Sequence, residues 1–227
     1  MSPPKTMKAL VVEQGWLKSV RDLKAIDWPV PALDADSVLV KVEAVSVNFF
    51  DILQVQGKYQ FKPPFPFIPG AEFAGTVEAV GANADGGFKP GDKVFGGTFT
   101  GAYAQYIVSA PQQLFKIPAG LTVDEASGIY GTYPTSYAAF KVRANLKPGE
   151  TVLVHAAAGS VGLAAVQCAK ALGAKTVIAT CGTDEKCAIA IKQGGADHAI
   201  NYTTDKKWFD TVKRLTDGVG VDVVYGE

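Results

Sequence analysis

The stretch HAAAGSVGLAAVQCAKALGA, from His155 to Ala174, decides the fold of the C-terminal half of the chain. It begins within the segment 151–157, which is typical of a buried strand, and it continues as an apolar helical face that ends at a glycine. Ala157, Gly159 and Gly162 occupy the three positions of the dinucleotide-binding turn, with alanine in place of the first glycine. Strand, turn and helix therefore follow one another as in a nucleotide-binding unit.

Each position of this turn has a physical role. Gly159 lets the backbone approach a pyrophosphate, and Gly162 lets the helix pack closely on the strand. The amides of Ser160 and Val161 open a helix whose positive end faces the phosphates. A tight turn with a purely structural role is the alternative.

The end of the next strand selects between the two nicotinamide cofactors. NADH binding favours an acid about 20 residues after the fingerprint, but Gly182 stands there and Thr183 follows it. Lys186 can reach a 2′-phosphate, and Tyr202, after the third strand, can flank it. These residues predict NADPH. The acidic pair at 184–185 is the counter-evidence, since either carboxylate would repel the phosphate.

Strands and helices alternate from residue 151 onward, which predicts right-handed βαβ units and a parallel sheet. A complete sheet of the order 3-2-1-4-5-6 needs six strands, and this chain supplies four. The last strand is expected at a sheet edge. The expected strands are 151–157, 175–181, 198–202 and 221–225, and the expected helices are 161–172, 185–193 and 207–216.

The N-terminal part has a different pattern, with short alternating strands and glycine turns that predict a small β-barrel. In the segment 37–47, valines and an alanine occupy one face and charged residues the other, as in a half-buried strand. Thr122 and Glu125 have capping-box spacing, and Pro134 is expected in the first turn of a second helix. We therefore expect two domains, 1–121 and 122–227.

Composition excludes several classes of protein. Lys plus Arg and Asp plus Glu both number 22, so the net charge is zero and a nucleic-acid partner is disfavoured. Three cysteines without metal-ligand spacing indicate neither a disulfide framework nor a zinc site, which favours a reducing, cytoplasmic location. The uncharged segment 151–169 contains polar residues and two glycines, so we read it as a strand and a helix rather than a membrane span. The segment 9–12 is too short for a signal-peptide core.

Two N-terminal motifs, GAEFAGTVEAVG (70–81) and VSVNFFDILQVQGKY (45–59), resemble the medium-chain dehydrogenase/reductase superfamily when taken with HAAAGSVG. The chain is most similar to its zinc-independent, zeta-crystallin-like quinone oxidoreductases. The resemblance implies a GroES-like β-barrel domain, a Rossmann domain of the α/β class that is incomplete at its C-terminus, and an active site in a cleft. Family members are homodimers, and their chains return after this point to complete the barrel.

The resemblance also implies site residues. Asn48 stands where zinc-dependent members have a cysteine ligand, and no cysteine precedes Cys168. Asn48 is then expected beside the nicotinamide and the acceptor, with Asp51 holding that loop. Helix capping is the alternative for both residues. Tyr59 is expected to offer a hydroxyl to a quinone oxygen or to a bridging water, and Thr135 to pack near the nicotinamide ring.

The leading hypothesis is an NADPH-dependent reductase of quinones or related conjugated carbonyls, with no metal. An enoyl or alkenal reductase and a catalytically silent nucleotide-binding or structural protein are the alternatives. The missing strands lead us to expect either a truncated chain with poor activity or strands donated by a neighbouring chain.

Overall fold

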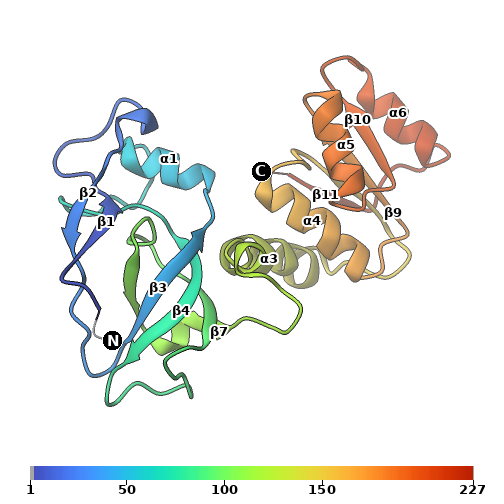
Figure 1. The fold of residues 1–227 in the computed structure, drawn as a ribbon. Helices are drawn as coiled ribbons and strands as arrows, with labels where there is room; N and C mark the ends of the chain where they lie inside the picture. Colours follow the sequence, from blue (N-terminus) through green and yellow to red (C-terminus); the bar gives the residue numbers. More distant parts are fainter. Residues whose placement is uncertain (1–2, 227) are drawn as a thin grey trace. The chain divides into compact units, whose positions relative to one another are not determined.

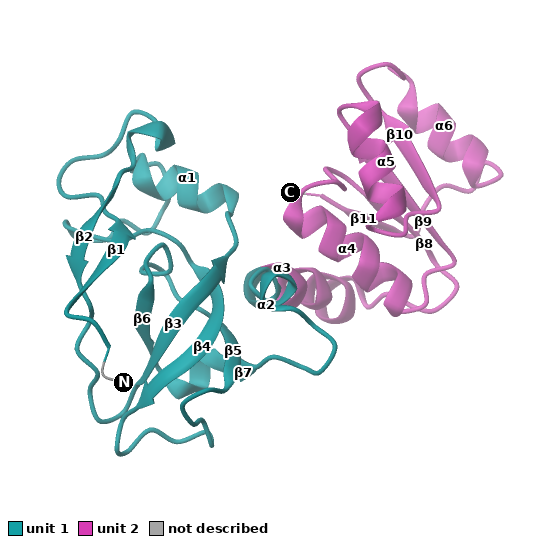
Figure 2. Cartoon of the chain, viewed as in Figure 1, with its two compact units in different colours: residues 1–131 teal, residues 132–227 magenta. Residues whose placement is uncertain are grey.

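The computed structural model describes residues 3–226, and the chain divides into two compact units between Gly131 and Thr132 (Figure 2). The boundary predicted from the sequence, between residues 121 and 122, lies ten residues before this division. Helix α2 (Val123–Ala126) packs against strands β3, β4 and β5 of the first unit, so the division lies after it. The expected capping box of α2 is present, because Thr122 accepts from the backbone of Glu125 and Glu125 accepts from the backbone of Thr122.

The first unit is built on a five-stranded antiparallel sheet in the order β6-β3-β4-β5-β7. Figure 1 labels β3, β4 and β7 of this sheet, and Figure 2 labels all five strands. A two-stranded sheet, β1–β2, contributes a second apolar cluster with Leu39 and Tyr106. One helix, α1 (Phe49–Val55), and two 3₁₀ turns, η1 (Val20–Asp22) and η2 (Pro111–Gln113), connect the strands. The strands are β1 Thr6–Leu10, β2 Ala25–Pro29, β3 Val38–Val45, β4 Glu72–Val80, β5 Lys93–Gly97, β6 Tyr106–Ser109 and β7 Leu114–Lys116.

Strand β3 has the expected alternation only in its second half. From Lys41 onward, Val42 and Ala44 are half-buried, whereas Lys41 and Glu43 are exposed. In the first half Leu39 is also buried, because its face is covered by the cluster around β1. The expectation of a half-buried strand is therefore wrong for 38–40, where both faces are covered.

The second unit contains a four-stranded parallel sheet in the order β10-β9-β8-β11. This is the 3-2-1-4 part of the doubly wound order, as expected. Strand β11 pairs only with β8 among the described residues, so it lies at the sheet edge, and Val224 on it is exposed. The strands are β8 Thr151–Val154, β9 Thr176–Cys181, β10 His198–Asn201 and β11 Val223–Tyr225; the helices are α4 Ser160–Ala171, α5 Asp184–Lys192 and α6 Trp208–Leu215.

The expectation for Pro134 is wrong. Helix α3 runs from Ile129 to Ala138, so Pro134 is inside it rather than in its first turn. Helix α3 begins at Ile129, only three residues after α2 ends at Ala126. The sequence has no separate capping signal at Ile129, so Pro134 is the residue from which the helix start was predicted. The helix continues as a π-helical segment, η3 (Ala139–Ala144), and ends at Asn145, whose left-handed φ of 52° stops it before Pro148. Within residues 3–226, no helix has both the length and the apolar character needed to cross a bilayer.

Candidate functional site

The glycine-rich turn lies at the carboxyl end of β8, and α4 begins directly after it. A Cβ on Gly162 would lie 2.3 Å from the backbone oxygen of Ala156, so only glycine fits where the helix meets the turn. A Cβ on Gly159 would meet only that same oxygen, at 3.3 Å, which leaves its outer side open. The close approach predicted for Gly162 is therefore present, and Gly159 presents bare backbone.

The first turn of α4 has the form of an anion site. Gly159 is the N-cap and, as a glycine, provides no side-chain cap for the amides of the first turn. Ser160 is exposed and Val161 is half-buried at this end, while Ala157 is fully buried beneath the turn. Such a terminus stabilises a phosphate by amide hydrogen bonds and by the helix dipole.

Helix α3 is hydrogen-bonded to the first turn of α4. The hydroxyl of Ser136 donates to the backbone oxygen of Val161 over 3.1 Å, and it lies 3.4 Å from the hydroxyl of Tyr225 on β11. Thr135, the neighbour of Ser136, is exposed on α3. The structure thus places Thr135 on a helix that is bonded to the first turn of α4.

The turn between β9 and α5 brings together the four residues expected around a 2′-phosphate. Thr183 is the N-cap of α5, and its hydroxyl oxygen accepts from the amide of Lys186 over 3.2 Å. The Tyr202 hydroxyl lies over Gly182, 3.0 Å from the place where a Cβ would stand. Lys186 and Tyr202 are both exposed, so their polar ends are available to a ligand.

The two acidic residues at 184–185 in this turn differ in their hydrogen bonding. Asn201, at the end of β10, donates its side-chain amide to Asp184 Oδ1 over 2.7 Å. Thr203 closes the same corner by donating to the backbone oxygen of Gly182 over 2.8 Å. One of the two carboxylates that would oppose a phosphate is therefore engaged by a neutral donor.

A second polar cluster is buried in the first unit, around the start of α1. The side-chain amide of Asn48 donates to Glu72 Oε1 over 2.7 Å and to the Ser46 hydroxyl over 3.1 Å. Glu72 Oε2 accepts the backbone N–H of Gly131 over 3.0 Å. Asn48 is 7% exposed and Glu72 is 3% exposed. Glu72 therefore connects the N-cap of α1 with the first turn of α3.

Asp51 fastens α1 from the other side. Its Oδ2 accepts from the backbone N–H of Asn48 over 2.9 Å and from the Tyr103 hydroxyl over 2.8 Å. Burial raises the pKa of Asp51; the two hydrogen bonds oppose this shift and the nearby Glu72 adds to it. Burial and the neighbouring Asp51 also raise the pKa of Tyr103, so its phenol stays protonated and donates.

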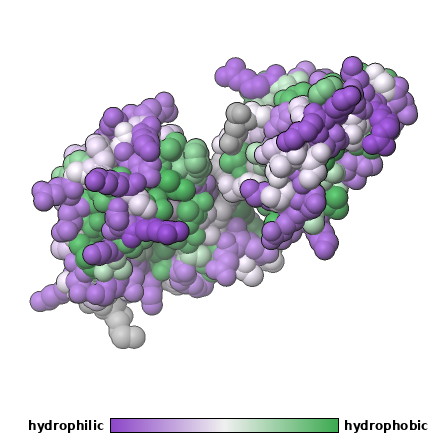
Figure 3. Space-filling view, turned by 90° about the horizontal axis from the view of Figure 1, so that it is seen from above, coloured by the Kyte–Doolittle hydropathy of each residue, from purple (hydrophilic) through white to green (hydrophobic). Residues whose placement is uncertain are grey.

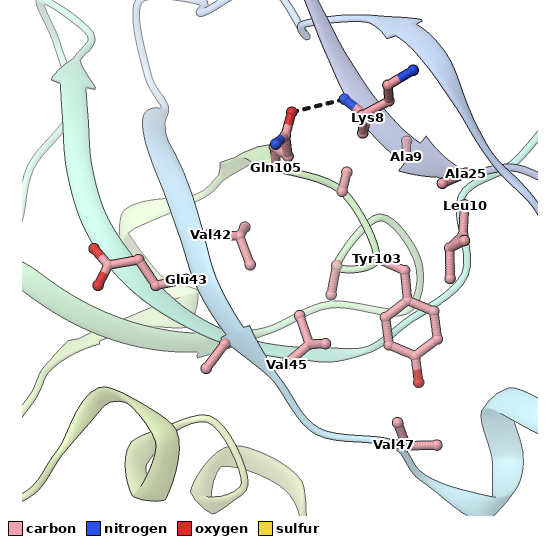
Figure 4. A pocket seen from close by; sticks show the side chains of 13 residues that line it. Lys8, Ala9, Leu10, Ala25, Val42, Glu43, Val45, Val47, Tyr103 and Gln105 are labelled. Atoms are coloured by element: carbon pink, nitrogen blue, oxygen red, sulfur yellow. Dashed lines mark hydrogen bonds between the residues drawn. The ribbon is translucent and has the colours of Figure 1, made fainter.

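Tyr103 also lines an apolar cavity of about 380 Å³ between β1, β3 and the segment 102–105 (Figure 4). In this view its hydroxyl points toward the segment that carries Val47. None of the predicted residues Asn48, Asp51 and Tyr59 lines this cavity. The candidate site around Asn48 and Asp51 therefore lies outside this cavity.

Tyr59 is placed differently from Asn48 and Asp51. Its ring packs against Phe50 of α1, with 5.3 Å between ring centroids, and is half-buried. The structure thus groups Asn48 with Asp51 in one hydrogen-bonded cluster and puts Tyr59 beside the same helix through an apolar contact.

Sequence reasoning missed several residues of these clusters, among them Glu72, Tyr103, Ser136 and Asn201. An acid at the head of the apolar strand EFAGTVEAV was a usable signal for Glu72, because a buried carboxyl group needs partners. The other three residues bond across long sequence separations and have no local pattern. Among residues 3–226, no group of three or more His, Cys, Asp and Glu side chains is arranged to hold a metal ion.

The two units correspond to known domain families. The "Alcohol dehydrogenase GroES-like domain" matches residues 34–119, and the "Zinc-binding dehydrogenase" domain matches residues 160–226. The fold and the two clusters thus define a GroES-like domain followed by a nucleotide-binding dehydrogenase domain.

Individual proteins that are similar to this chain identify a group within these domain families. A quinone oxidoreductase of Pongo abelii is 40% identical over 87% of this chain and 59% of its own length. The crystal structure of a "probable oxidoreductase" from Mycobacterium abscessus is 37% identical, with a TM-score of 0.89, over 98% of this chain and 68% of that one. The Thermus thermophilus quinone oxidoreductase, solved also with NADPH, is 34% identical, with a TM-score of 0.79, over 96% and 65%.

The chain belongs to the medium-chain dehydrogenase/reductase superfamily and groups there with the quinone oxidoreductases. It spans 59% of the length of the Pongo abelii relative.

Proposed function

We propose that this chain carries the active-site and cofactor-binding portions of an NADPH-dependent reductase that transfers hydride to quinones or related conjugated carbonyls without zinc. The observation that carries the proposal is the turn at 182–186, where the position of the ribose-binding acid is a glycine and Lys186 is exposed. The NADPH complex of the Thermus thermophilus relative supports the same cofactor. We assign residues 1–121 to the acceptor and 122–227 to the nucleotide.

The described residues fit an NADPH molecule. The bare backbone of Gly159 and the amides of Ser160 and Val161 would hold the pyrophosphate. Lys186 would pair with the 2′-phosphate, with Gly182, Thr183 and Tyr202 around it. NADPH, when bound, supplies the hydride, so no Lewis acid is needed.

The remaining residues would position the acceptor. Asn48 uses both amide protons inside the protein, on Glu72 and Ser46, so we assign it to shaping the loop beside the nicotinamide rather than to binding by its N–H groups. Asp51 fixes the backbone of the same loop. Tyr59 would donate to the acceptor oxygen, and Thr135 would limit the position of the nicotinamide ring.

The proposal extends to the setting of the protein. All three cysteines are free and buried, which fits a reducing compartment such as the cytoplasm. The partner proposed is a small-molecule quinone or enone.

Loss of NADPH absorbance tests the reaction, first with 1,2-naphthoquinone and then with an α,β-unsaturated ketone. Turnover of either acceptor, with a lower rate for NADH, is the expected result. NADPH binding without turnover of either acceptor would instead identify a silent nucleotide-binding protein. No binding of NADPH would overturn the cofactor assignment itself.

A further inference from the structure

Two exposed aromatic rings lie side by side in the first unit. Phe61 is 43% exposed and Phe99 is 69% exposed, and their ring centroids are 5.4 Å apart at 46°. Figure 3 shows apolar side chains reaching the surface of this unit between polar areas. A single exposed ring is common, but two rings that contact each other outside the core offer a surface for an apolar ligand.

The backbone that carries Phe99 is held firmly. The buried amide of Gln54 on α1 donates to the backbone oxygen of Phe99 over 3.2 Å. On either side, the amide of Thr98 donates to Ala71 over 2.8 Å, and that of Gly101 donates to Ile68 over 2.7 Å. The ring is therefore presented outward by an ordered loop, which lowers the entropy cost of binding to it.

The same loop is connected to the polar cluster around Asn48. Gly97, at the end of β5, is paired with Glu72 across the sheet, and Phe99 follows two residues later. Paired Cα atoms lie about 5 Å apart, and two residues of extended chain add at most about 7 Å. The backbone of Phe99 therefore lies within about 12 Å of Glu72, the residue that holds Asn48.

We propose that Phe61 and Phe99 are specificity residues that select flat, ring-bearing acceptors, such as naphthoquinones, over acyclic enones. This inference rests on the proposed function and names the substrate class within it. Aromatic rings prefer offset or edge-to-face contacts with other rings, and the 46° pair offers both a face and an edge. An acyclic enone has no π-face of comparable area, so it gains little from the pair.

The test compares kcat/KM for 1,4-naphthoquinone and for methyl vinyl ketone at saturating NADPH, with the full chain. Phe99→Leu should lower the naphthoquinone value about tenfold and leave the methyl vinyl ketone value within about twofold. Phe61→Leu should act in the same direction, and Phe99→Tyr, which keeps the ring, should retain activity. Phe209→Leu is the matched control, because Phe209 is 50% exposed and contacts Trp208 on α6 of the other unit.

An equal loss with both acceptors, or no loss with naphthoquinone, would overturn the inference. If the unmodified chain reduces neither acceptor, the proposed function fails, and binding is then measured directly by saturation-transfer NMR with 2-naphthol, a flat ring that accepts no hydride. A signal that Phe99→Leu abolishes and Phe209→Leu preserves would support the aromatic site. A signal unchanged by Phe99→Leu, or no signal from the unmodified chain, would refute it.

Discussion

Asn48 and Glu72 are joined by a 2.7 Å hydrogen bond, although they are 24 residues apart and belong to different elements. Because the other oxygen of Glu72 accepts from Gly131, one carboxyl group connects three segments of the chain. The loop that we assign to the acceptor is therefore positioned by β4 as well as by its own Ser46 and Asp51.

We expect Glu72→Gln to destabilise the first unit by about 1–3 kcal/mol. Both oxygens of Glu72 accept hydrogen bonds, but the glutamine side chain has one oxygen and one NH₂ group. Its NH₂ group must therefore face another donor, either the side-chain amide of Asn48 or the N–H of Gly131. Urea unfolding measures the effect. Glu78→Gln, a half-buried position on the same strand, is the control and should change stability much less; equal losses at both positions would contradict the role given to Glu72.

The pKa of Asp51 gives a pH-dependent prediction. Burial raises it, so the stability that this carboxyl group contributes is complete below its unfolded pKa, about 3.9, and is lost as the pH rises through the folded pKa. Among the described residues no donor reaches its buried Oδ1, which also disfavours the ionised form. As the pH is raised from 4 to 7, the unmodified chain should therefore lose stability relative to the Asp51→Asn variant. The midpoints of urea unfolding at each pH measure this difference.

Glu43 provides a control of opposite sign. Hydrogen bonds from Lys93 and Thr76 lower its pKa, so its contribution is present above the unfolded pKa, about 4.3, and is lost as the pH falls through the folded pKa. Glu43→Gln should then be destabilising at pH 7 and neutral in acid, by a small amount because the pair with Lys93 is largely exposed. The same pH trend in both variants would refute the assignment for Asp51.

Local signals in the sequence predicted the second unit well. The turn at 157–162, the helix after it and the four-strand order all depend on short-range patterns of glycine spacing and apolar periodicity. The polar cluster of the first unit was only partly predictable. Asn48 and Asp51 are three residues apart, but the bond from Tyr103 to Asp51 spans 52 residues and has no sequence pattern. The prediction for Pro134 was wrong because no capping residue in the sequence marks the start of α3 at Ile129.

A metal analysis tests the absence of zinc from the proposed reaction. Asn48 occupies the position at which zinc-dependent relatives are expected to have a cysteine, and its amide is bound to Glu72 instead. We expect less than stoichiometric zinc in the purified chain, and reductase activity that is unchanged by a chelator and by added zinc. Stoichiometric zinc that is lost together with activity would show the proposal to be wrong.

Lys186→Ala should weaken NADPH binding by about 1–3 kcal/mol and spare NADH, because only NADPH has the 2′-phosphate for a charge-assisted hydrogen bond. Fluorescence titration with both cofactors gives the two dissociation constants. Lys192→Ala, an exposed position in the last turn of the same helix, controls for general charge and should weaken neither. Equal weakening of NADPH and NADH by Lys186→Ala would remove the basis for choosing NADPH.

The two glycines of the turn should fail in different ways when each is replaced by alanine. At Gly162 the added Cβ would lie 2.3 Å from the backbone oxygen of Ala156, and backbone atoms can move away only by shifting α4. We expect a stability loss of about 1–3 kcal/mol from this overpacking. At Gly159 the Cβ would meet only one atom, at 3.3 Å, and its φ of −76° suits alanine.

Gly159→Ala should therefore fold with nearly unchanged stability but bind NADPH more weakly, since the methyl group stands where the pyrophosphate would approach the backbone. Thermal unfolding without cofactor and titration with NADPH separate the two effects. If Gly159→Ala binds NADPH as tightly as the unmodified chain, the turn is only a structural connection between β8 and α4, and the pyrophosphate site must lie elsewhere.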